Sequence, residues 1–207
     1  MARGSALVVL LCCGSWAAGC APLAETVEAP DLVVGGRGDD VGHGRLLSLQ
    51  LWVDDNDYAT VDRLRARVRA LFVAAREHEL LDDKTVVVLP EYTGTWLVAA
   101  GEGAGVVEKA KLSDAMTDLA VAHLPGFLYT SWTADVDDGD AYAAFTEKAD
   151  AMADAYDDVF GGLADEFDVV VVAGSILLPG AHLSAGGHLR ARPGEPLQNV
   201  SVVFDAD

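Results

Sequence analysis

The sequence is poor in basic residues and in cysteine. It has 14 lysines and arginines against 33 aspartates and glutamates, which gives its 207 residues a formal net charge of −19 at pH 7. Such a surplus of acid disfavours nucleic acids and anionic membrane surfaces as partners, because both repel an acidic protein at long range. The three cysteines, Cys12, Cys13 and Cys20, all lie near the amino terminus. No structural disulfide is therefore expected in the body of the protein.

Lysine is especially scarce, and aspartate supplies most of the acid. A surface of this kind is expected of a protein adapted to high salt, and equally of an ordinary acidic protein encoded by a GC-rich genome. The two explanations predict different responses of stability to ionic strength, so both stay open at this point.

Three familiar kinds of site are not supported by the sequence. Ser175 follows an apolar run but lacks the G-x-S-x-G turn of serine hydrolases, so a structural role is predicted for it, with Gly174 allowing close backbone packing. The glycine-rich residues 101–105 do not have G-x-G-x-x-G spacing and are expected to form a loop. His182 and His188 have a spacing that fits no helical metal pair. We expect surface histidines and no metal site.

The amino-terminal segment has the features of an export signal. Arg3 supplies a positive charge, residues 6–11 are apolar but too few to span a membrane, and residues 17–20 form a small-residue site ending in cysteine. The segment resembles a bacterial lipoprotein signal, which implies removal of residues 1–19, a lipid on Cys20 and anchoring to the cell membrane or the outer membrane. Plain secretion or a periplasmic location is the alternative, because the small-residue site does not begin with the usual leucine.

The rest of the chain divides into a tether and a domain. Residues 20–44 contain prolines and a glycine cluster, and we predict that they form a flexible tether. From residue 45 onward, strand-like and helix-like segments alternate, which is the pattern of a layered α/β fold. The expected strands are residues 45–53, 86–89, 126–131, 167–176 and 197–207, and the expected helices are residues 58–79, 106–124 and 140–166.

Two of these helices have a clear division into apolar and polar faces. The arginines of residues 58–79 are expected to form a solvated face rather than a nucleic-acid site, since no aromatic residues are interleaved with them. The aspartates of residues 140–166 are likewise expected to face water. Residues predicted to point inward from this helix are Tyr142, Phe145, Ala149, Met152, Tyr156, Val159, Phe160 and Leu163.

The most informative stretch is residues 86–91, with the sequence VVVLPE. Its apolar run suits a strand covered on both faces, and the proline cannot donate to a strand ladder, so Glu91 is placed at the carboxyl end of a strand. Sites in layered α/β proteins are usually built at that edge, and a carboxylate shielded there by Tyr92 and Trp96 is a candidate general base. Alternatively, Glu91 is only the first solvated residue after a core strand, and the two aromatic residues belong to the core.

Three segments, taken in order, resemble the carbon-nitrogen hydrolase (nitrilase) superfamily. They are the strand that ends in Leu-Pro-Glu at Glu91, the strand that ends in Ala-Gly-Ser at Ser175, and the strand led by Asn199 that closes on Phe-Asp-Ala-Asp at Asp207. The resemblance covers residues 45–207 and implies a layered α-β-β-α sandwich of the nitrilase type, incomplete at its carboxyl end. It further implies a small-molecule amide or nitrile substrate and no cofactor. Homodimers are common in that family, although nothing in this sequence establishes one.

The resemblance also assigns roles to particular residues. In that family a glutamate, a lysine and a cysteine form the catalytic triad, and by motif Glu91 takes the place of the glutamate, as general base toward the thiol. The family's lysine and cysteine follow the strand that begins at Asn199, and this sequence reaches Asp207 before either motif. We therefore expect the chain as given to be inactive alone, because it has no nucleophile to form an acyl-enzyme. Tyr92, Trp96 and Asn199 are candidates for the substrate pocket.

Two functions remain open from the sequence. The first is a hydrolase of an amide or nitrile carbon-nitrogen bond, or a related acyl transferase, of which residues 45–207 form the front part. The second is a secreted or lipid-anchored binding module that has kept the scaffold and lost catalysis. An open reading frame beyond Asp207 with the lysine and cysteine motifs would favour the enzyme, and a stop codon would favour the module.

Overall fold

The computed structural model describes residues 33–36, 43–102 and 139–206. The expected signal peptide, Cys20, most of the tether, the helix at 106–124 and the strand at 126–131 lie outside these ranges. Within them the chain is a mixed α/β protein with two α-helices and several small sheets, in agreement with the expected class. No helix in the described ranges is long and apolar enough to cross a membrane.

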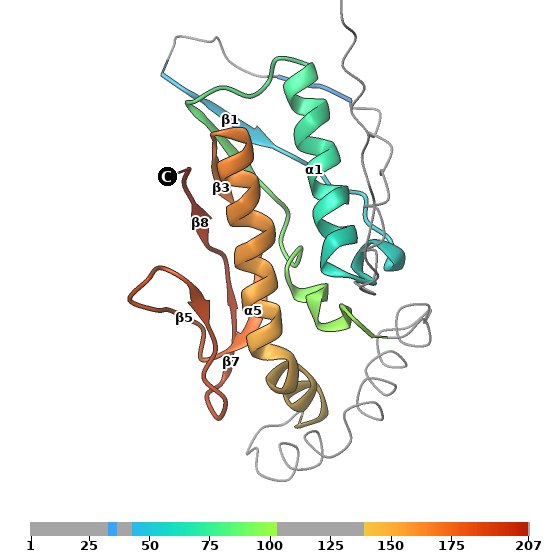
Figure 1. Ribbon diagram of the computed structural model, residues 1–207, viewed down its shortest axis with the longest axis vertical. Coiled ribbons are helices and arrows are strands. Elements are labelled where there is room, and N and C mark those ends of the chain that lie inside the picture. The colour runs from blue at the N-terminus through green and yellow to red at the C-terminus, as the bar shows by residue number, and fades with distance from the viewer. Residues whose placement is uncertain (1–32, 37–42, 103–138, 207) are drawn as a thin grey trace, which may run out of the picture.

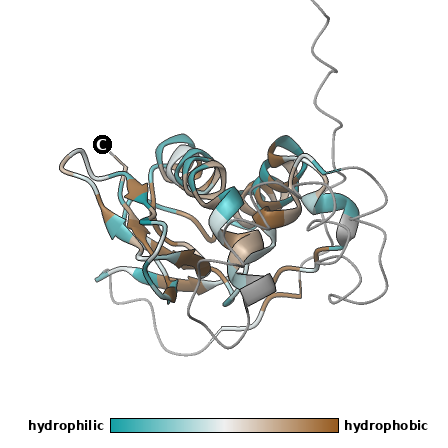
Figure 2. Ribbon diagram, turned by 90° about the horizontal axis from the view of Figure 1, so that it is seen from below, coloured by the Kyte–Doolittle hydropathy of each residue, from teal (hydrophilic) through white to brown (hydrophobic). Residues whose placement is uncertain are grey.

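The largest sheet has the strand order β1-β2-β3-β8 (Figure 1). Its first three strands are parallel, and β8 is antiparallel to β3. Parallel neighbours need crossover connections, and α1 and α5 lie in the two crossovers. Because right-handed crossovers that step in one direction put their helices on the same side, both helices cover one face of the sheet (Figure 2). The bounds are β1 Arg45–Ser48, α1 Val61–Glu77, β2 Thr85–Val88, α5 Gly139–Phe167, β3 Val170–Val172 and β8 Val203–Phe204.

The first expected strand and helix are both shorter in the structure than predicted. β1 ends at Ser48, so the prediction of strand for residues 49–53 is wrong, and Leu49 makes only one more ladder bond, to Val88 O. A 3₁₀ helix, η1 (Asp55–Tyr58), then precedes α1. Thr60 caps α1 by accepting a hydrogen bond from the backbone of Arg63 at 3.2 Å, which sets the start of the helix.

The long helix α5 agrees with its prediction in position and in orientation. All eight residues expected to point inward are buried, and all but Tyr142 belong to the large hydrophobic core cluster. Two aromatic contacts tie the helix to its neighbours: Phe167 lies 5.2 Å from Phe72 of α1, and Tyr156 lies 5.9 Å from Phe204 of β8, measured between ring centroids. The helical period of the apolar residues was thus a sufficient guide to which face is buried.

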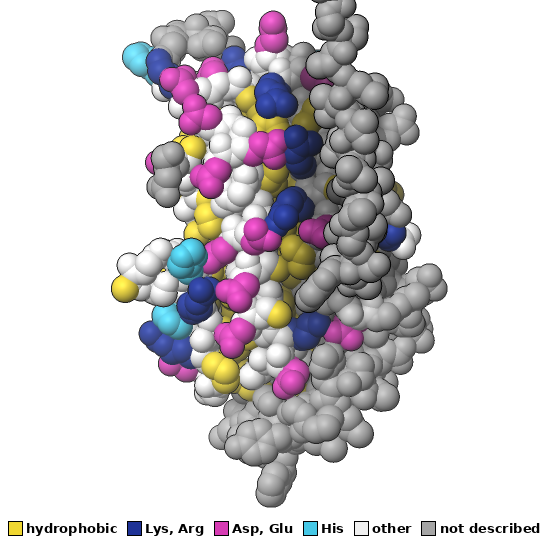
Figure 3. All heavy atoms as spheres, viewed as in Figure 1, with side chains coloured by type: hydrophobic (Ala, Val, Ile, Leu, Met, Phe, Trp, Pro, Cys, Tyr) yellow, Lys and Arg dark blue, Asp and Glu magenta, His cyan; other side chains and the backbone are white. Residues whose placement is uncertain are grey.

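The arginines of α1 do more than face water. Arg69 donates to Glu166 of α5 at 2.8 Å, Arg65 pairs with Asp158 of α5, and the Arg76 guanidinium lies 4.8 Å from the centroid of the Phe167 ring. Figure 3 shows basic and acidic side chains side by side along this seam between the helices. The expected solvated arginine face is therefore a row of partly exposed ion pairs that joins α1 to α5.

Each of the two last predicted strands is broken in the structure. Residues 167–176 contain β3 and the start of β4 (Ile176–Pro179), and residues 197–207 contain β7 (Leu197–Val200) and β8. β4 and β7 pair with each other in a separate two-stranded sheet. The segments that follow β3 and β7 bend at the same level, where Ala173 N donates to Val202 O at 3.0 Å. A small hairpin of β5 (His182–Leu183) and β6 (Leu189–Arg190) lies between β4 and β7 in the chain.

Candidate functional site

The carboxyl ends of β2 and β3 meet at one edge of the sheet, and a short turn there carries Glu91. Leu89 N still donates to Val172 O at 3.1 Å, and Pro90, which has no N–H, ends the pairing. Glu91 follows as an exposed residue. Its predicted place at a strand's carboxyl end is confirmed, whereas the predicted shielding by the aromatic residues that follow is not observed.

Hydrogen bonds to Ser175 and within the turn fix the path of the chain around Glu91. The backbone N–H of Tyr92 donates to Ser175 Oγ at 2.8 Å, and that of Gly94 donates to Ser175 O at 3.0 Å. Thr93 Oγ1 donates to Pro90 O at 2.7 Å. These bonds hold Tyr92 at a φ of 64°, an uncommon conformation for a bulky residue. The predicted structural role of Ser175 is confirmed.

Two glycines allow the turn to approach β3 and α5 closely. A Cβ atom on Gly174 would lie 2.0 Å from Pro90 O, so any side chain there would push the two strand ends apart. A Cβ atom on Gly94 would lie 2.6 Å from the ring of Tyr156. The close packing predicted for Gly174 is confirmed, and Gly94 has the same role on the other side of the turn.

Two buried tyrosines hold this edge together with their hydroxyl groups. Tyr156 OH donates to Gly174 O at 2.8 Å and accepts from Val202 N at 3.3 Å, which links the bends that follow β3 and β7. Tyr58 OH donates to Thr93 O at 2.9 Å. Burial raises the pKa of Tyr156 to about 12. The pKa of Tyr58 is raised as well, by burial and then by the charge of Asp57. Both hydroxyls therefore stay protonated near neutral pH and can donate.

Among the described residues Glu91 has one hydrogen-bond partner, and it comes from the far end of the sequence. Asn199, on β7, donates from Nδ2 to Glu91 Oε1 at 2.8 Å. No described residue donates to Oε2, which is left open to solvent or to a ligand. The view of Glu91 as merely the first solvated residue accounts for its exposure but not for this bond, which joins two of the three segments that carry the family resemblance.

The neighbouring aromatic side chains are not part of the core. Tyr92 is 48% exposed, and Trp96, in the 3₁₀ helix η2 (Thr95–Ala99), is 41% exposed. The alternative that they are core aromatics is therefore wrong. Each of these half-exposed rings offers an apolar face and stays accessible, which suits the wall of a binding surface.

The described residues do not place a lysine beside Glu91. Lys84 comes immediately before β2, at the opposite end of that strand. Lys148, on α5, is largely buried, pairs with Glu102 and donates to Ala100 O at 3.0 Å. All three cysteines lie outside the described residues. Glu91 and Asn199 are thus the part of the expected site that the structure brings together.

The histidines and other metal-ligating side chains do not gather at this edge. Across the described ranges, no group of three or more histidine, cysteine, aspartate and glutamate side chains is placed to hold a metal ion. His188 is exposed and lies 3.4 Å from Asp157 of α5, and His182 is half-buried in β5.

Several residues that build the site were not predicted from the sequence as parts of it. Tyr156 was expected only as a core residue, and Thr93, Gly94 and Tyr58 were not singled out. The available signal was the Ala-Gly-Ser sequence after an apolar run, which places a small and a hydroxyl side chain at a strand end. Their partners depend on contacts between segments distant in the chain.

Comparison of the chain with protein-family models, with curated proteins and with solved structures finds no significant match.

Proposed function

We propose that this chain forms part of a carbon-nitrogen hydrolase of the nitrilase type that acts on an amide or nitrile group of a small molecule. Glu91 is the proposed general base, and Asn199 is the proposed residue that positions it. The single observation that carries the proposal is the hydrogen bond between these two side chains at the carboxyl edge of the sheet. A strand-end carboxylate with one oxygen held and the other open is arranged to take a proton from a neighbouring group.

The unequal cover of the sheet supports the sandwich part of the proposal. On the face opposite the helices, the paired positions form two rows: Leu46, Val86 and Val170 in one, and Ser48, Val88, Val172 and Val203 in the other. Every one of these residues is half-buried or exposed, although all but one are apolar. An apolar sheet face of this kind needs a second layer, and in an α-β-β-α sandwich that layer is a second sheet.

The chemistry requires two groups besides Glu91. A thiol must lose its proton to the Glu91 carboxylate so that the thiolate can attack the amide carbon and form a carbon-sulfur bond. The carboxylic acid then returns the proton to the departing amine, and an ammonium group stabilises the negative charge that develops on the oxygen. The described residues do not supply the thiol or the ammonium group, so the proposal assigns both to other parts of the enzyme.

The test uses the polypeptide encoded by the complete reading frame and a panel of small aliphatic and aromatic amides and nitriles. Ammonia release identifies a substrate, and Glu91→Gln is then expected to reduce turnover by at least a thousandfold, because an amide side chain cannot take the proton. Glu77→Gln, on the exposed end of α1, is the matched control and is expected to leave turnover unchanged. Near-normal hydrolysis by Glu91→Gln would falsify the assignment of the base.

Asn199 has a distinct expected effect. Asn199→Ala removes the hydrogen bond to Glu91 Oε1 and leaves the carboxylate free to rotate, so we expect turnover to fall by about tenfold with the melting temperature unchanged. Unchanged turnover in Asn199→Ala would show that Asn199 does not position Glu91.

A second candidate function is a binding module on the same scaffold. The observation that favours it is the exposure of Glu91 together with Tyr92 and Trp96, which suits capture of a polar ligand at the surface. The two candidates differ in what the complete reading frame encodes and in whether any covalent intermediate forms. A protein that binds an amide without releasing ammonia, and whose affinity falls in Glu91→Gln, would support the module.

We also propose that the protein is exported and carries a lipid on Cys20, with residues 20–44 as its tether. The support is the small-residue site at residues 17–20 behind a short apolar stretch. Labelled palmitate should enter the wild-type protein but not Cys20→Ser, and the variant should leave the membrane fraction. Labelling of Cys20→Ser would contradict the anchor.

A further inference from the structure

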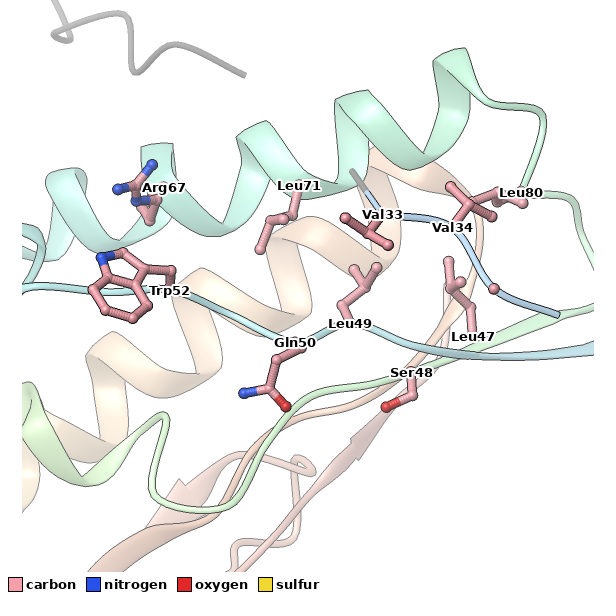
Figure 4. Close-up of a pocket in the computed structure, with 11 residues that line it drawn as sticks. Val33, Val34, Leu47, Ser48, Leu49, Gln50, Trp52, Arg67, Leu71 and Leu80 are labelled. Carbon is pink, nitrogen blue, oxygen red and sulfur yellow. The ribbon is translucent and has the colours of Figure 1, made fainter. Parts of the chain in front are cut away.

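A groove lies away from the Glu91 edge, between α1 and residues 47–52, which form the end of β1 and the segment after it. It has a volume of about 440 Å³ (Figure 4). Leu47 and Leu49 line it from the strand side, and Leu71 of α1 and Leu80 line it from the helix side. One half of the groove is therefore aliphatic.

This aliphatic half is not filled by the chain segment that borders it. Val33 and Val34 lie along the groove in Figure 4, yet their exposed fractions are 101% and 52%. Gly35, which follows them, has no atom of another segment within 4 Å of the position of a Cβ. The two valines extend the apolar wall and leave the groove open.

The other end of the groove is polar and contains the guanidinium of an ion pair. Arg67 and Trp52 lie there on opposite sides, with Trp52 82% exposed (Figure 4). Arg67 Nε donates to Asp57 Oδ2 at 3.1 Å, and the same oxygen accepts from the backbone of Asp54 at 3.0 Å. Asp57 is itself buried, at 9% exposure, so it holds the guanidinium in one orientation.

The terminal nitrogens of Arg67 remain available. No described residue accepts a hydrogen bond from either of them, and the side chain is 22% exposed. A guanidinium held at Nε presents its remaining N–H groups in a plane, which is the geometry that binds a carboxylate through two parallel hydrogen bonds.

The spacing along α1 joins the two ends into one site. Arg67 and Leu71 are four residues apart, so they lie one above the other on the same side of the helix. A ligand along this side would meet the terminal nitrogens of Arg67 at one end and aliphatic side chains at the other. The groove thus matches a molecule with an acidic head and an apolar tail.

We propose that this groove binds a small amphipathic carboxylate, with its carboxylate on Arg67 and its unbranched aliphatic chain between α1 and β1. The volume lies near the lower end of the range for small-molecule sites, which favours a single chain of medium length over a two-chain lipid. The site is separate from Glu91 and does not depend on the proposed hydrolase activity.

The test uses the full chain and dodecanoate labelled with bromine, a contact quencher of tryptophan fluorescence. Trp52 lies at the polar end of the groove, so 2-bromododecanoate is expected to quench it saturably and 12-bromododecanoate to quench it much less. The difference should vanish in Trp52→Phe. Equal quenching by the two labels would overturn the proposed orientation and with it the site.

Two pairs of variants test the two ends of the groove. Arg67→Gln should weaken dodecanoate binding by at least tenfold, as expected for loss of a charge-assisted pair, and should leave dodecanol binding within twofold. Arg69→Gln, which removes a charge from the same helix outside the groove, is the control. Val34→Asp should weaken both ligands, whereas Leu183→Asp, at an exposed leucine of β5, should weaken neither.

Each remaining outcome either supports or overturns the proposed carboxylate site. If Arg67→Gln unfolds because Asp57 loses its partner, Val34→Asp gives the answer, since that side chain is already half-exposed. Unchanged dodecanoate affinity in Val34→Asp would overturn the proposal. So would quenching that appears only with phosphatidylcholine vesicles containing brominated lipid, because that result would mean contact with a membrane surface and not binding of a free carboxylate.

Discussion

The two faces of the four-stranded sheet have nearly the same kind of sequence and very different surroundings. On the inner face, Val87 and Val171 are fully buried under α1 and α5. On the outer face, Leu46 and Val203 are 73% and 61% exposed. The apolar run of β2 correctly predicted a strand, and it was also expected to be covered on both faces. Among the described residues, however, only one side is covered, so apolar sequence shows what a strand can bury and not what is present to bury it.

The largest expected effect is the difference in stability between a variant with a charge on the inner face of the sheet and one with the same charge on the outer face. Val87→Asp puts an unpaired carboxylate into the core and should lower the free energy of unfolding by roughly 4 kcal/mol or more. Leu46→Asp places the same charge on the outer face and should cost no more than about 1 kcal/mol. Urea unfolding followed by circular dichroism measures both.

The penalty of Leu46→Asp also tests the proposed second sheet. In the polypeptide from the complete reading frame, a second sheet over the outer face would raise the penalty of Leu46→Asp several-fold, because the charge would then be buried. An equally small penalty in the longer polypeptide would argue against a second layer on that face.

The next effect concerns the edge of the sheet at the carboxyl ends of β2 and β3. Gly174→Ala forces a Cβ to within 2.0 Å of Pro90 O, and we expect a loss of roughly 3 kcal/mol from the shift of backbone that this overlap requires. Gly162→Ala in α5 is the control, since no atom of another segment lies within 4 Å of its Cβ position. That change should stabilise the helix by about 0.5–1 kcal/mol. Similar unfolding midpoints for the two variants would contradict the close approach.

A smaller effect tests the hydroxyl group of Tyr156, which lies on α5 and donates a hydrogen bond at this edge. The pKa of Tyr156 is about 12 in the folded protein against an ordinary value of 10.0, so between these values the folded state binds more protons than the unfolded state. The stability that the Tyr156 hydroxyl contributes should therefore be fully present below pH 10 and be lost as the pH rises to about 12. Tyr156→Phe should lose about 1–2 kcal/mol at neutral pH and show a weaker decline in alkali. A decline as steep as that of the wild type would point to other groups, Tyr58 first.

The smallest effect concerns the solvent side of the helices, farthest from the sheet. Arg69→Gln breaks a partly exposed ion pair with Glu166, and we expect a loss of less than about 1 kcal/mol in dilute buffer that disappears in molar salt. The wild-type protein measured beside it addresses adaptation to salt, because repulsion within a chain of charge −19 is relieved as ionic strength rises. Equal urea midpoints in low and molar salt would remove that explanation of the acidic composition.

The sequence was most informative where one local period decides the outcome. The eight inward residues of α5 were predicted correctly because apolar side chains at helical spacing must share a face. The position of Glu91 followed from Pro90, which cannot extend a ladder whatever surrounds it. Both predictions rest on properties of a few adjacent residues.

Three of the failures involve segments that are distant in the chain. The breaks after Val172 and Val200 could not be predicted from the apolar runs, because they depend on how the two segments pack and on the hydroxyl of Tyr156 that links them. The arginines of α1 were expected to be solvated, since their partners on α5 lie more than 90 residues away. The shielding of Glu91 failed for the same reason, because the directions of Tyr92 and Trp96 depend on the packing of the turn.

The sequence by itself determined the alternation of strands and helices, the buried face of α5 and the place of Glu91 at a strand end, because each follows from local geometry and side-chain chemistry. Only the tertiary structure decided that Asn199 meets Glu91, that the described residues cover one face of the sheet and not the other, and that Arg67 and Leu71 line one groove. Those outcomes depend on which surfaces come together, and pairing between distant segments leaves no period in the sequence that forms them.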